Sequence, residues 1–266
     1  MNKKGFAISV VLYSIVFLLI SVLYMIVGIL KTRYHNENDL RDAIVEQLNE
    51  SVDRIIICDR LTGTEGNLIT GDTFKCDVNG DGIYSEETEK FYYISNYYNQ
   101  INKKFDPSIA VLIHSLNSYD GNSVSTNSPV QWNTILTVNS GPSNINASYA
   151  SSKWLNTNLK NNPRSIMVGY GTSASEYTTF RYTRAARLLS VEEYQNGCNP
   201  TSKCNFLFNT TVAEVGDGIW LENIASPSSG TVYVLKASNH ELSTAAVTSN
   251  NMARAVIEVP KNSINY

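Results

Sequence analysis

The hydrophobic pattern divides this 266-residue chain into an apolar amino-terminal segment and a polar remainder. Residues 6–30 contain no charged side chain, and a short leader with Lys3 and Lys4 precedes them. As a helix rising about 1.5 Å per residue, this segment would be roughly 38 Å long, more than the hydrocarbon thickness of about 30 Å. The pattern predicts one membrane-spanning helix whose amino end is cytoplasmic.

A secretory signal peptide is the alternative for this segment. Such peptides have an apolar region of about 7 to 15 residues, followed by a small-residue cleavage site. Here the run is longer and continues into the charged residues Lys31 and Arg33. A retained membrane anchor is therefore the favoured interpretation.

A second apolar pattern predicts an amphipathic stalk. Apolar residues recur at spacings of three and four, and charged residues fall mostly between them. They are Leu40, Ile44, Val45, Leu48, Val52, Ile55 and Ile56. We expect one helix over residues 6–57, roughly 75 Å long. A separate stalk joined near residues 32–38 is the alternative.

Residues 58–266 are long enough for one domain with a sizeable core, or for two small ones. Asn, Ser, Thr and Tyr are abundant, charged residues make up 17% of the chain, and the net charge is -3. There is no basic patch with interleaved aromatic residues, so no nucleic-acid partner is expected. The composition is typical of an exported head.

Short runs rich in β-branched and aromatic residues, bounded by polar turns, predict strands in this head. They cover residues 73–78, 90–95, 110–114, 165–169, 231–235 and 255–259. Helices are expected at 149–159 and 191–196, the second with Ser190 and Glu193 as a capping box. Residues 117–127 and 140–146 have the composition of loops. The predicted class is α+β, with a long N-terminal helix carrying a mixed head.

The four cysteines form two local pairs in sequence, Cys58 with Cys76 and Cys198 with Cys204. Four cysteines allow three pairings, of which we favour two local disulfides, in agreement with export. Free buried thiols are the first alternative and a zinc site is the second. Zinc is disfavoured because the spacing is not C-x2-C and no histidine is close to a cysteine in sequence.

Residues 77–82 match the opening of a calcium loop. Asp77, Asn79 and Asp81 occupy ligand positions one, three and five, and Gly82 occupies position six. Position twelve is Thr88 instead of Glu, and the following run is predicted to be a strand. A β-hairpin with Asn-Gly and Asp-Gly turns is therefore the default interpretation, and a Ca²⁺ site is the alternative.

No catalytic motif is found. The sequence lacks a phosphate-binding glycine loop, a metalloprotease helix and a nucleophile elbow. His114 follows the apolar run 111–113, and His240 lies in a polar turn, so packed or solvated histidines are expected. We expect no enzyme.

The tetrapeptide Lys3-Lys4-Gly5-Phe6 followed by an apolar helix resembles a type IV prepilin or pseudopilin. The resemblance implies a membrane peptidase that cuts between Gly5 and Phe6 and methylates Phe6, with other pilin-like subunits as partners. The family usually has Glu at the fifth mature residue, where this chain has Val10. That departure argues against assembly into a classical pilus.

The carboxyl-terminal part, about residues 149–266, resembles an uncharacterised bacterial surface domain related to the C-type-lectin-like fold, also seen in the sulfatase-modifying family. The matching segments are 182–194, Cys198, 204–207, 219–222 and 253–261. The resemblance implies that residues 187–189 open a helix, that Trp220 lies in a core strand, and that residues 254–256 begin a closing strand. Ala255 replaces the usual Pro. The copper-dependent oxidation of the formylglycine-generating relatives is not carried over, because Cys198 and Cys204 look like a structural clip.

Together these patterns predict a basic leader (1–5), a transmembrane and stalk helix (6–57) and an extracellular head (58–266). The expected location is the bacterial cell membrane, with a single pass through the lipid bilayer. Two functions are open: a surface protein that binds an unidentified extracellular ligand, or a structural pseudopilin of a secretion or pilus machine. Asn223, Asn239 and Tyr233 are reasonable contact residues for a ligand.

Overall fold

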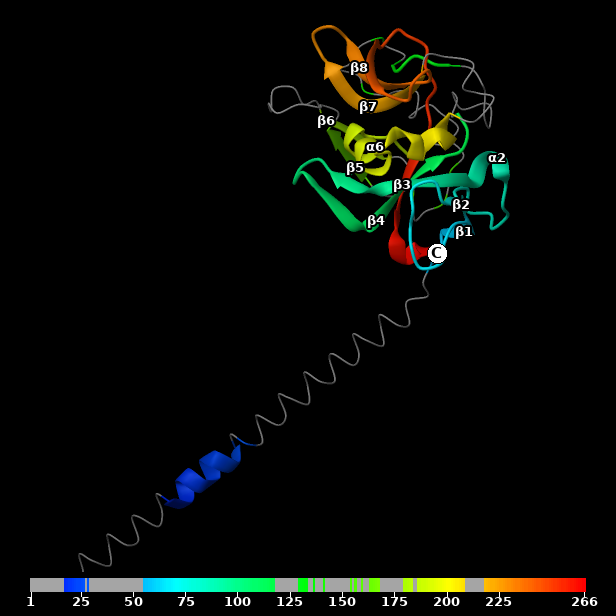
Figure 1. Ribbon diagram of the computed structural model, residues 1–266. Helices are drawn as coiled ribbons and strands as arrows, with labels where there is room; N and C mark the ends of the chain where they lie inside the picture. Colours follow the sequence, from blue (N-terminus) through cyan, green and yellow to red (C-terminus); the bar gives the residue numbers. More distant parts are fainter. Residues whose placement is uncertain are drawn as a thin grey trace, which may run out of the picture. The chain divides into compact units, whose positions relative to one another are not determined.

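The computed structural model describes residues 17–26, 28, 55–117, 129–133, 136, 141, 154, 156, 159, 163–167, 179–183, 186–208 and 218–266. The chain forms two compact units, Met1–Arg54 and Ile55–Tyr266. Each is described by itself below (Figure 1).

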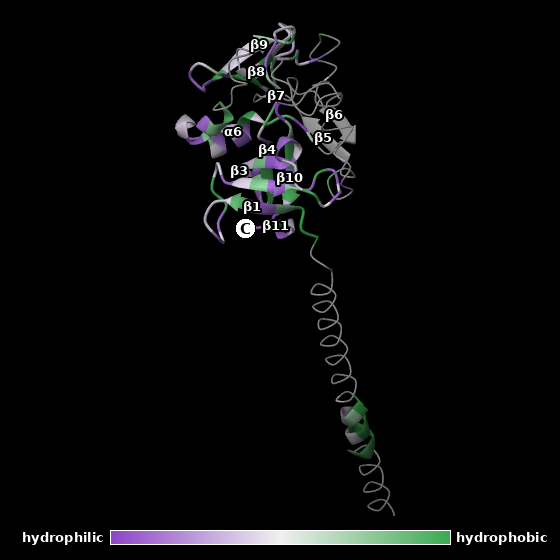
Figure 2. Cartoon of the chain, turned by 90° about the vertical axis from the view of Figure 1, so that its right-hand side faces the viewer, coloured by the Kyte–Doolittle hydropathy of each residue, from purple (hydrophilic) through white to green (hydrophobic). Residues whose placement is uncertain are grey.

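The described part of the first unit, residues 17–26 and 28, is helical and carries apolar side chains on all sides. Their exposed fractions run from 40% at Val22 to 79% at Tyr24. Ser21 satisfies its hydroxyl by donating to the Phe17 carbonyl at 2.9 Å. Figure 2 shows this segment as predominantly hydrophobic. Within the described residues, no helix is both long enough and apolar enough to span a bilayer. Gly5, Phe6 and Val10 lie outside them.

The second unit begins with residues 55–57, which are not helical. The amide of Ile57 donates to the Ser263 carbonyl at 2.8 Å, and the Ile57 side chain is buried in the head. The prediction of a stalk helix through residue 57 is therefore wrong for residues 55–57. Backbone pairing near the carboxyl terminus replaces the helical hydrogen bonds there.

A six-stranded sheet forms one side of the head, in the order β10-β4-β3-β2-β1-β11. Its strands are β1 (Cys58–Thr62), β2 (Thr73–Cys76), β3 (Lys90–Asn99), β4 (Lys104–His114), β10 (Val256–Pro260) and β11 (Ile264–Asn265). All neighbours are antiparallel except β1 and β11, which are parallel. The carboxyl-terminal strands thus complete a sheet begun by the first strands, so residues 149–266 do not form a separate unit.

Helix α6 (Val191–Gly197) packs against β3 and β7 and lies between the six-stranded sheet and the sheet that contains β7 (Figures 1 and 2). A three-stranded sheet contains β7 (Gly218–Ser226), β8 (Thr231–Lys236) and β9 (Leu242–Ala246), and a two-stranded sheet pairs β5 (Pro163–Met167) with β6 (Thr179–Thr183). Three further short helices are described: α2 (Glu86–Glu89), η3 (Thr201–Leu207) and η5 (Lys261–Ser263).

Strand β4 explains the uninterrupted apolar run at 110–113. Ala110 and Leu112 point into one core cluster with Trp220, whereas Val111 and Ile113 point into a second cluster. Successive side chains of a strand face opposite sides, so a strand covered on both faces must be apolar at every position.

The predicted class, α+β, is confirmed, and each of the six predicted strands overlaps a strand of the structure. The predicted helix at 191–196 is α6, and Ser190 and Glu193 form the expected capping box. Trp220 lies in β7 and is 1% exposed, as the resemblance implied. Its implication that residues 187–189 open a helix is wrong, because Arg187 and Leu189 form β-bridges to Val256 and Leu221 and the helix begins at Val191. The predicted helix at 149–159 and the loops at 117–127 and 140–146 lie largely outside the described residues.

Candidate functional site

The connection between β2 and β3, residues 77–89, contains the predicted calcium-loop residues. Antiparallel pairing of β2 with β3 confirms the predicted hairpin, but its connection is a folded loop ending in α2 instead of a tight turn. The carboxylate of Asp77 accepts hydrogen bonds from the amides of Gly80 at 2.7 Å and Gly82 at 3.2 Å. Both glycines have positive φ (81° and 73°), which side chains with a Cβ rarely adopt.

The middle of the loop is ordered by its own side chains. Asn79 Oδ1 accepts from the Asp81 amide at 2.9 Å, and Asp81 Oδ1 accepts from the Ile83 amide at 2.7 Å. Asn79 Nδ2 donates to the second Asp81 oxygen at 2.9 Å. The side-chain oxygens of Asp77, Asn79 and Asp81 therefore all accept hydrogen bonds from backbone amides within residues 80–83.

A fourth donor, Glu89, comes from α2. Carboxylate oxygens of Asp77, Asp81 and Glu89 all lie within 4.8 Å of one another. Glu89 is 1% exposed and its Oε2 accepts from the Ser85 amide at 2.7 Å. Among the described residues, its Oε1 has no hydrogen-bond partner. The standard spacing places Thr88 instead of Glu at position twelve, and the carboxylate that lies beside Asp77 and Asp81 belongs to the next residue, Glu89.

The electrostatics of Glu89 reflect this setting. Burial raises the pKa of its carboxyl, and the nearby Asp77 and Asp81 charges add to this shift, whereas the backbone amides of Ser85 and Val78 oppose it. A cavity of about 220 Å³ adjoins the loop and is lined in part by Asp77, Glu89 and Tyr84. Oxygen-only donors of this kind suit hard cations such as Ca²⁺ or Mg²⁺.

All four cysteines are paired in the structure. Cys58 bonds to Cys76 across β1 and β2, and Cys198 bonds to Cys204 after α6. These are the two local pairings favoured from sequence, and the four described cysteines include no free thiol. The zinc and free-thiol alternatives are therefore wrong. The first bridge directly precedes the loop, because Cys76 is followed by Asp77.

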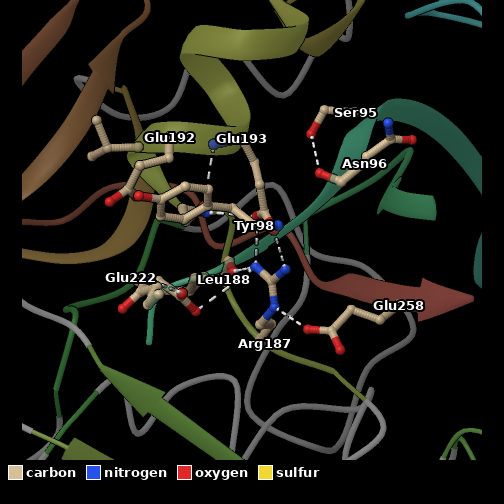
Figure 3. Close-up of polar contacts among 12 residues, drawn as sticks. Ser95, Asn96, Tyr98, Arg187, Leu188, Glu192, Glu193, Glu222 and Glu258 are labelled. Atoms are coloured by element: carbon tan, nitrogen blue, oxygen red, sulfur yellow. Dashed lines mark hydrogen bonds and ion pairs between the residues drawn. The ribbon is translucent and has the colours of Figure 1, made fainter. Parts of the chain in front are cut away.

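A second polar cluster, which the sequence did not predict, surrounds Arg187 in the interior (Figure 3). Its guanidinium donates from Nη2 to Glu193 Oε1 at 2.6 Å, from Nη1 to Glu193 Oε2 at 2.9 Å, and from Nε to Glu258 at 2.6 Å. Glu193 Oε1 also accepts from the Tyr98 amide at 3.1 Å. The cluster thus joins the N-terminus of α6 to β3 and β10.

Glu222 is the weakest partner in this cluster. One of its oxygens lies 3.9 Å from Arg187 Nη1, and Gln100 donates to the other at 3.3 Å. In the described part of the chain, Oε2 accepts no hydrogen bond. Burial raises the pKa of Glu222 to about 8, although Arg187 acts in the opposite direction. One guanidinium faces three carboxyl groups, so it cannot balance the charge of all three. The cluster therefore fits a structural role in which Glu222 is protonated.

His114 is packed, as one of the two sequence-based alternatives proposed. It is 2% exposed, and its ring lies 5.2 Å from Phe91 and 5.6 Å from Trp154 between centroids. Burial lowers the pKa of His114 to about 4. His240 lies in a turn with φ of 60° and stacks on Phe208. Both rings are held by packing contacts.

One suggested contact residue is wrongly assigned. Asn223 is fully buried, and its Oδ1 accepts from the Val191 amide at 2.8 Å, which satisfies an amide at the start of α6. It is therefore a structural residue. Asn239 is exposed and donates to Glu241 at 2.7 Å, and Tyr233 is partly buried.

Comparisons with known protein families, with curated proteins and with solved structures found no match for this chain. The prepilin-like and lectin-like resemblances therefore stay predictions.

Proposed function

We propose that this protein is a membrane-anchored, pilin-like surface protein of a bacterial cell, whose extracellular head binds a ligand or a surface. The observation that carries the proposal is the helix at residues 17–26, which exposes apolar side chains all round. Such a helix needs an apolar environment, because leaving apolar area in water costs about 25 cal/mol per Å². The uncharged run 6–30 is long enough for that environment to be a lipid bilayer.

The head supports an extracytoplasmic location. Two disulfides close it, at Cys58–Cys76 and Cys198–Cys204. Disulfides persist in oxidising compartments and are rare in the cytosol. With Lys3 and Lys4 holding the amino end inside, a single span places the head outside the cell.

Recognition is the activity proposed for the head, without catalysis. Its sequence carries no catalytic motif, and His114 is enclosed by aromatic rings. A lectin-like arrangement of the carboxyl-terminal part is included in the proposal on the resemblance alone.

A structural pseudopilin is the second candidate, favoured by the Gly5-Phe6 junction. In it, a prepilin peptidase would process the chain and the apolar helix would pack against other pilin-like subunits. Val10 in place of the family's usual Glu favours the solitary surface protein. Chemical cross-linking followed by detergent extraction distinguishes the two candidate functions, because only a pseudopilin should co-purify with other pilin-like chains.

The amino terminus provides the test of processing. Intact-mass analysis of the protein from membranes is expected to give a chain that begins at methylated Phe6. A Gly5→Leu variant should retain residues 1–5, whereas an Asn2→Ala control should be processed normally. Recovery of a chain beginning at Met1 from wild-type membranes would refute processing, and recovery from the soluble fraction without detergent would refute the anchor.

A further inference from the structure

We propose that residues 77–89 form a Ca²⁺ site in which Asp77, Asn79, Asp81 and Glu89 supply side-chain oxygens. The inference goes beyond the proposed surface function and does not depend on the membrane anchor, because all four residues belong to the head. It replaces the default interpretation of the loop as a simple hairpin turn.

Neighbouring acidic residues alone would not identify a site, since exposed carboxylates often lie close together. Glu89 adds an independent observation. Its side chain is almost fully buried, and among the residues described its Oε1 has no hydrogen-bond partner. One oxygen of the same carboxylate lies within 4.8 Å of oxygens of Asp77 and Asp81. A buried carboxylate oxygen is normally satisfied, and one that faces two other carboxylates is opposed by their charge. A bound divalent cation removes both penalties at once.

The donor chemistry selects the class of ion. The set contains carboxylate and amide oxygens and no nitrogen or sulfur ligand, which suits a hard cation. Asp77, Asn79 and Asp81 occupy positions one, three and five of a calcium loop, and Gly82 at position six provides the sharp turn. Glu89 at position thirteen takes the role that position twelve has in the standard loop, so the loop is one residue longer.

The location of the site gives it a mechanical role in the head. Asp77 follows Cys76, which is bonded to Cys58 in β1, whereas Glu89 immediately precedes β3. A cation held by both residues would close the connection between β2 and β3 in its folded form. Binding of Ca²⁺ should therefore stabilise the part of the head that contains β1, β2 and β3.

Thermal unfolding of the full-length protein in detergent tests the proposal. After chelation, addition of Ca²⁺ to 100 times its Kd should raise Tm by roughly 5 to 10 °C, because a ligand that binds only the folded state stabilises it. Glu89→Gln and Asp81→Asn should each reduce Ca²⁺ affinity at least tenfold. Glu87→Gln removes an exposed carboxylate from the same helix and should leave affinity unchanged.

Direct binding provides a readout that does not depend on stability. Tyr84 lines the same cavity as Asp77 and Glu89, so Tb³⁺ bound in place of Ca²⁺ should show tyrosine-sensitised emission that excess Ca²⁺ displaces. Asp81→Asn serves here if Glu89→Gln fails to fold, because Asp81 is exposed. The proposal is overturned if wild-type protein binds no Ca²⁺ in equilibrium dialysis, or if Asp81→Asn binds it as tightly as Glu87→Gln.

Discussion

At the scale of single residues, burial decides the behaviour of the charged groups in this head. Arg187 is 4% exposed and faces Glu193, Glu222 and Glu258, of which Glu193 and Glu258 make direct hydrogen bonds to it. A buried carboxylate without such a bond is better accommodated as the neutral acid. Glu222 is therefore the group in this cluster whose ionisation should cost stability.

Replacing Glu222 by Gln tests that cost. The pKa of Glu222 is raised from 4.5 to about 8, so its stabilising contribution is complete below pH 4.5 and is lost as pH rises through about 8. Between these two values the folded head retains a proton that the unfolded chain releases, so the wild-type free energy of unfolding should fall by about 1.4 kcal/mol for every pH unit. Glu222→Gln should lose this pH dependence, as measured by urea unfolding between pH 5 and 9.

The exposed Glu241→Gln is the control and should unfold with the wild-type pH profile. Equal pH profiles for Glu222→Gln and wild type would show that Glu222 is ionised in the folded head.

These residue-scale features are also the ones that sequence reasoning missed. The standard spacing places Thr88 instead of a carboxylate at position twelve, so the sequence gives no acidic ligand there, whereas the short helix α2 presents Glu89 one residue later. Asn223 was assigned to the surface because its residue type is polar. Its actual burial depends on α6 packing beside β7, and no local pattern contains that contact.

At the scale of elements, local signals succeeded where the structure is decided locally. The capping box of α6 is one example, since Ser190 Oγ accepts from the Glu193 amide at 3.3 Å and the Glu193 side chain accepts from the Ser190 amide at 3.3 Å. Both bonds span three residues, so their spacing is visible in the sequence. The order of the strands is different, because β10 pairs with β4 across more than a hundred residues.

Removal of the cap should weaken the head. Ser190→Ala eliminates the side-chain acceptor for an otherwise unpaired helix amide and should reduce the free energy of unfolding by about 1 kcal/mol. Urea unfolding gives the comparison, with the exposed Ser202→Ala as control. An unchanged midpoint for Ser190→Ala would mean that the cap contributes nothing measurable.

A side chain at Gly197 should destabilise the head, because α6 contacts the backbone of β3 at this residue. A Cβ at this position would lie 2.1 Å from the Ile94 carbonyl oxygen. Gly197→Ala should therefore cost about 1 to 3 kcal/mol through displacement of the helix. The neighbouring exposed residue provides the control, Asn196→Ala. Equal stability of the two variants, measured by denaturant unfolding, would contradict the close approach.

The two disulfides should differ in their contributions. The Cys58–Cys76 bridge spans 18 residues and the Cys198–Cys204 bridge spans 6. Loop-entropy reasoning predicts losses of about 3 and about 2 kcal/mol when each pair is replaced by Ser. Denaturant unfolding of the two double variants measures the difference. A larger loss at the shorter loop would show that packing around η3 outweighs chain entropy.

At the scale of the whole molecule, the proposed function depends on a division between an apolar helix and a disulfide-closed head. The sequence predicts this division because the uncharged run at residues 6–30 and the polar, cysteine-containing remainder can both be recognised without knowledge of long-range contacts. It did not predict that β1 and β11 would lie side by side, a pairing that brings the two ends of the head together. That pairing depends on long-range contacts among Ile57, Cys58 and Ile264.

The location of the head is the most direct test of the central claim. Intact cells should be treated with a membrane-impermeant amine reagent, and modification of the exposed Lys104 and Lys203 should be quantified by mass spectrometry. We predict that both lysines are modified in intact cells as fully as in lysed cells. Protection of both lysines until lysis would place the head in the cytoplasm and contradict the proposed function.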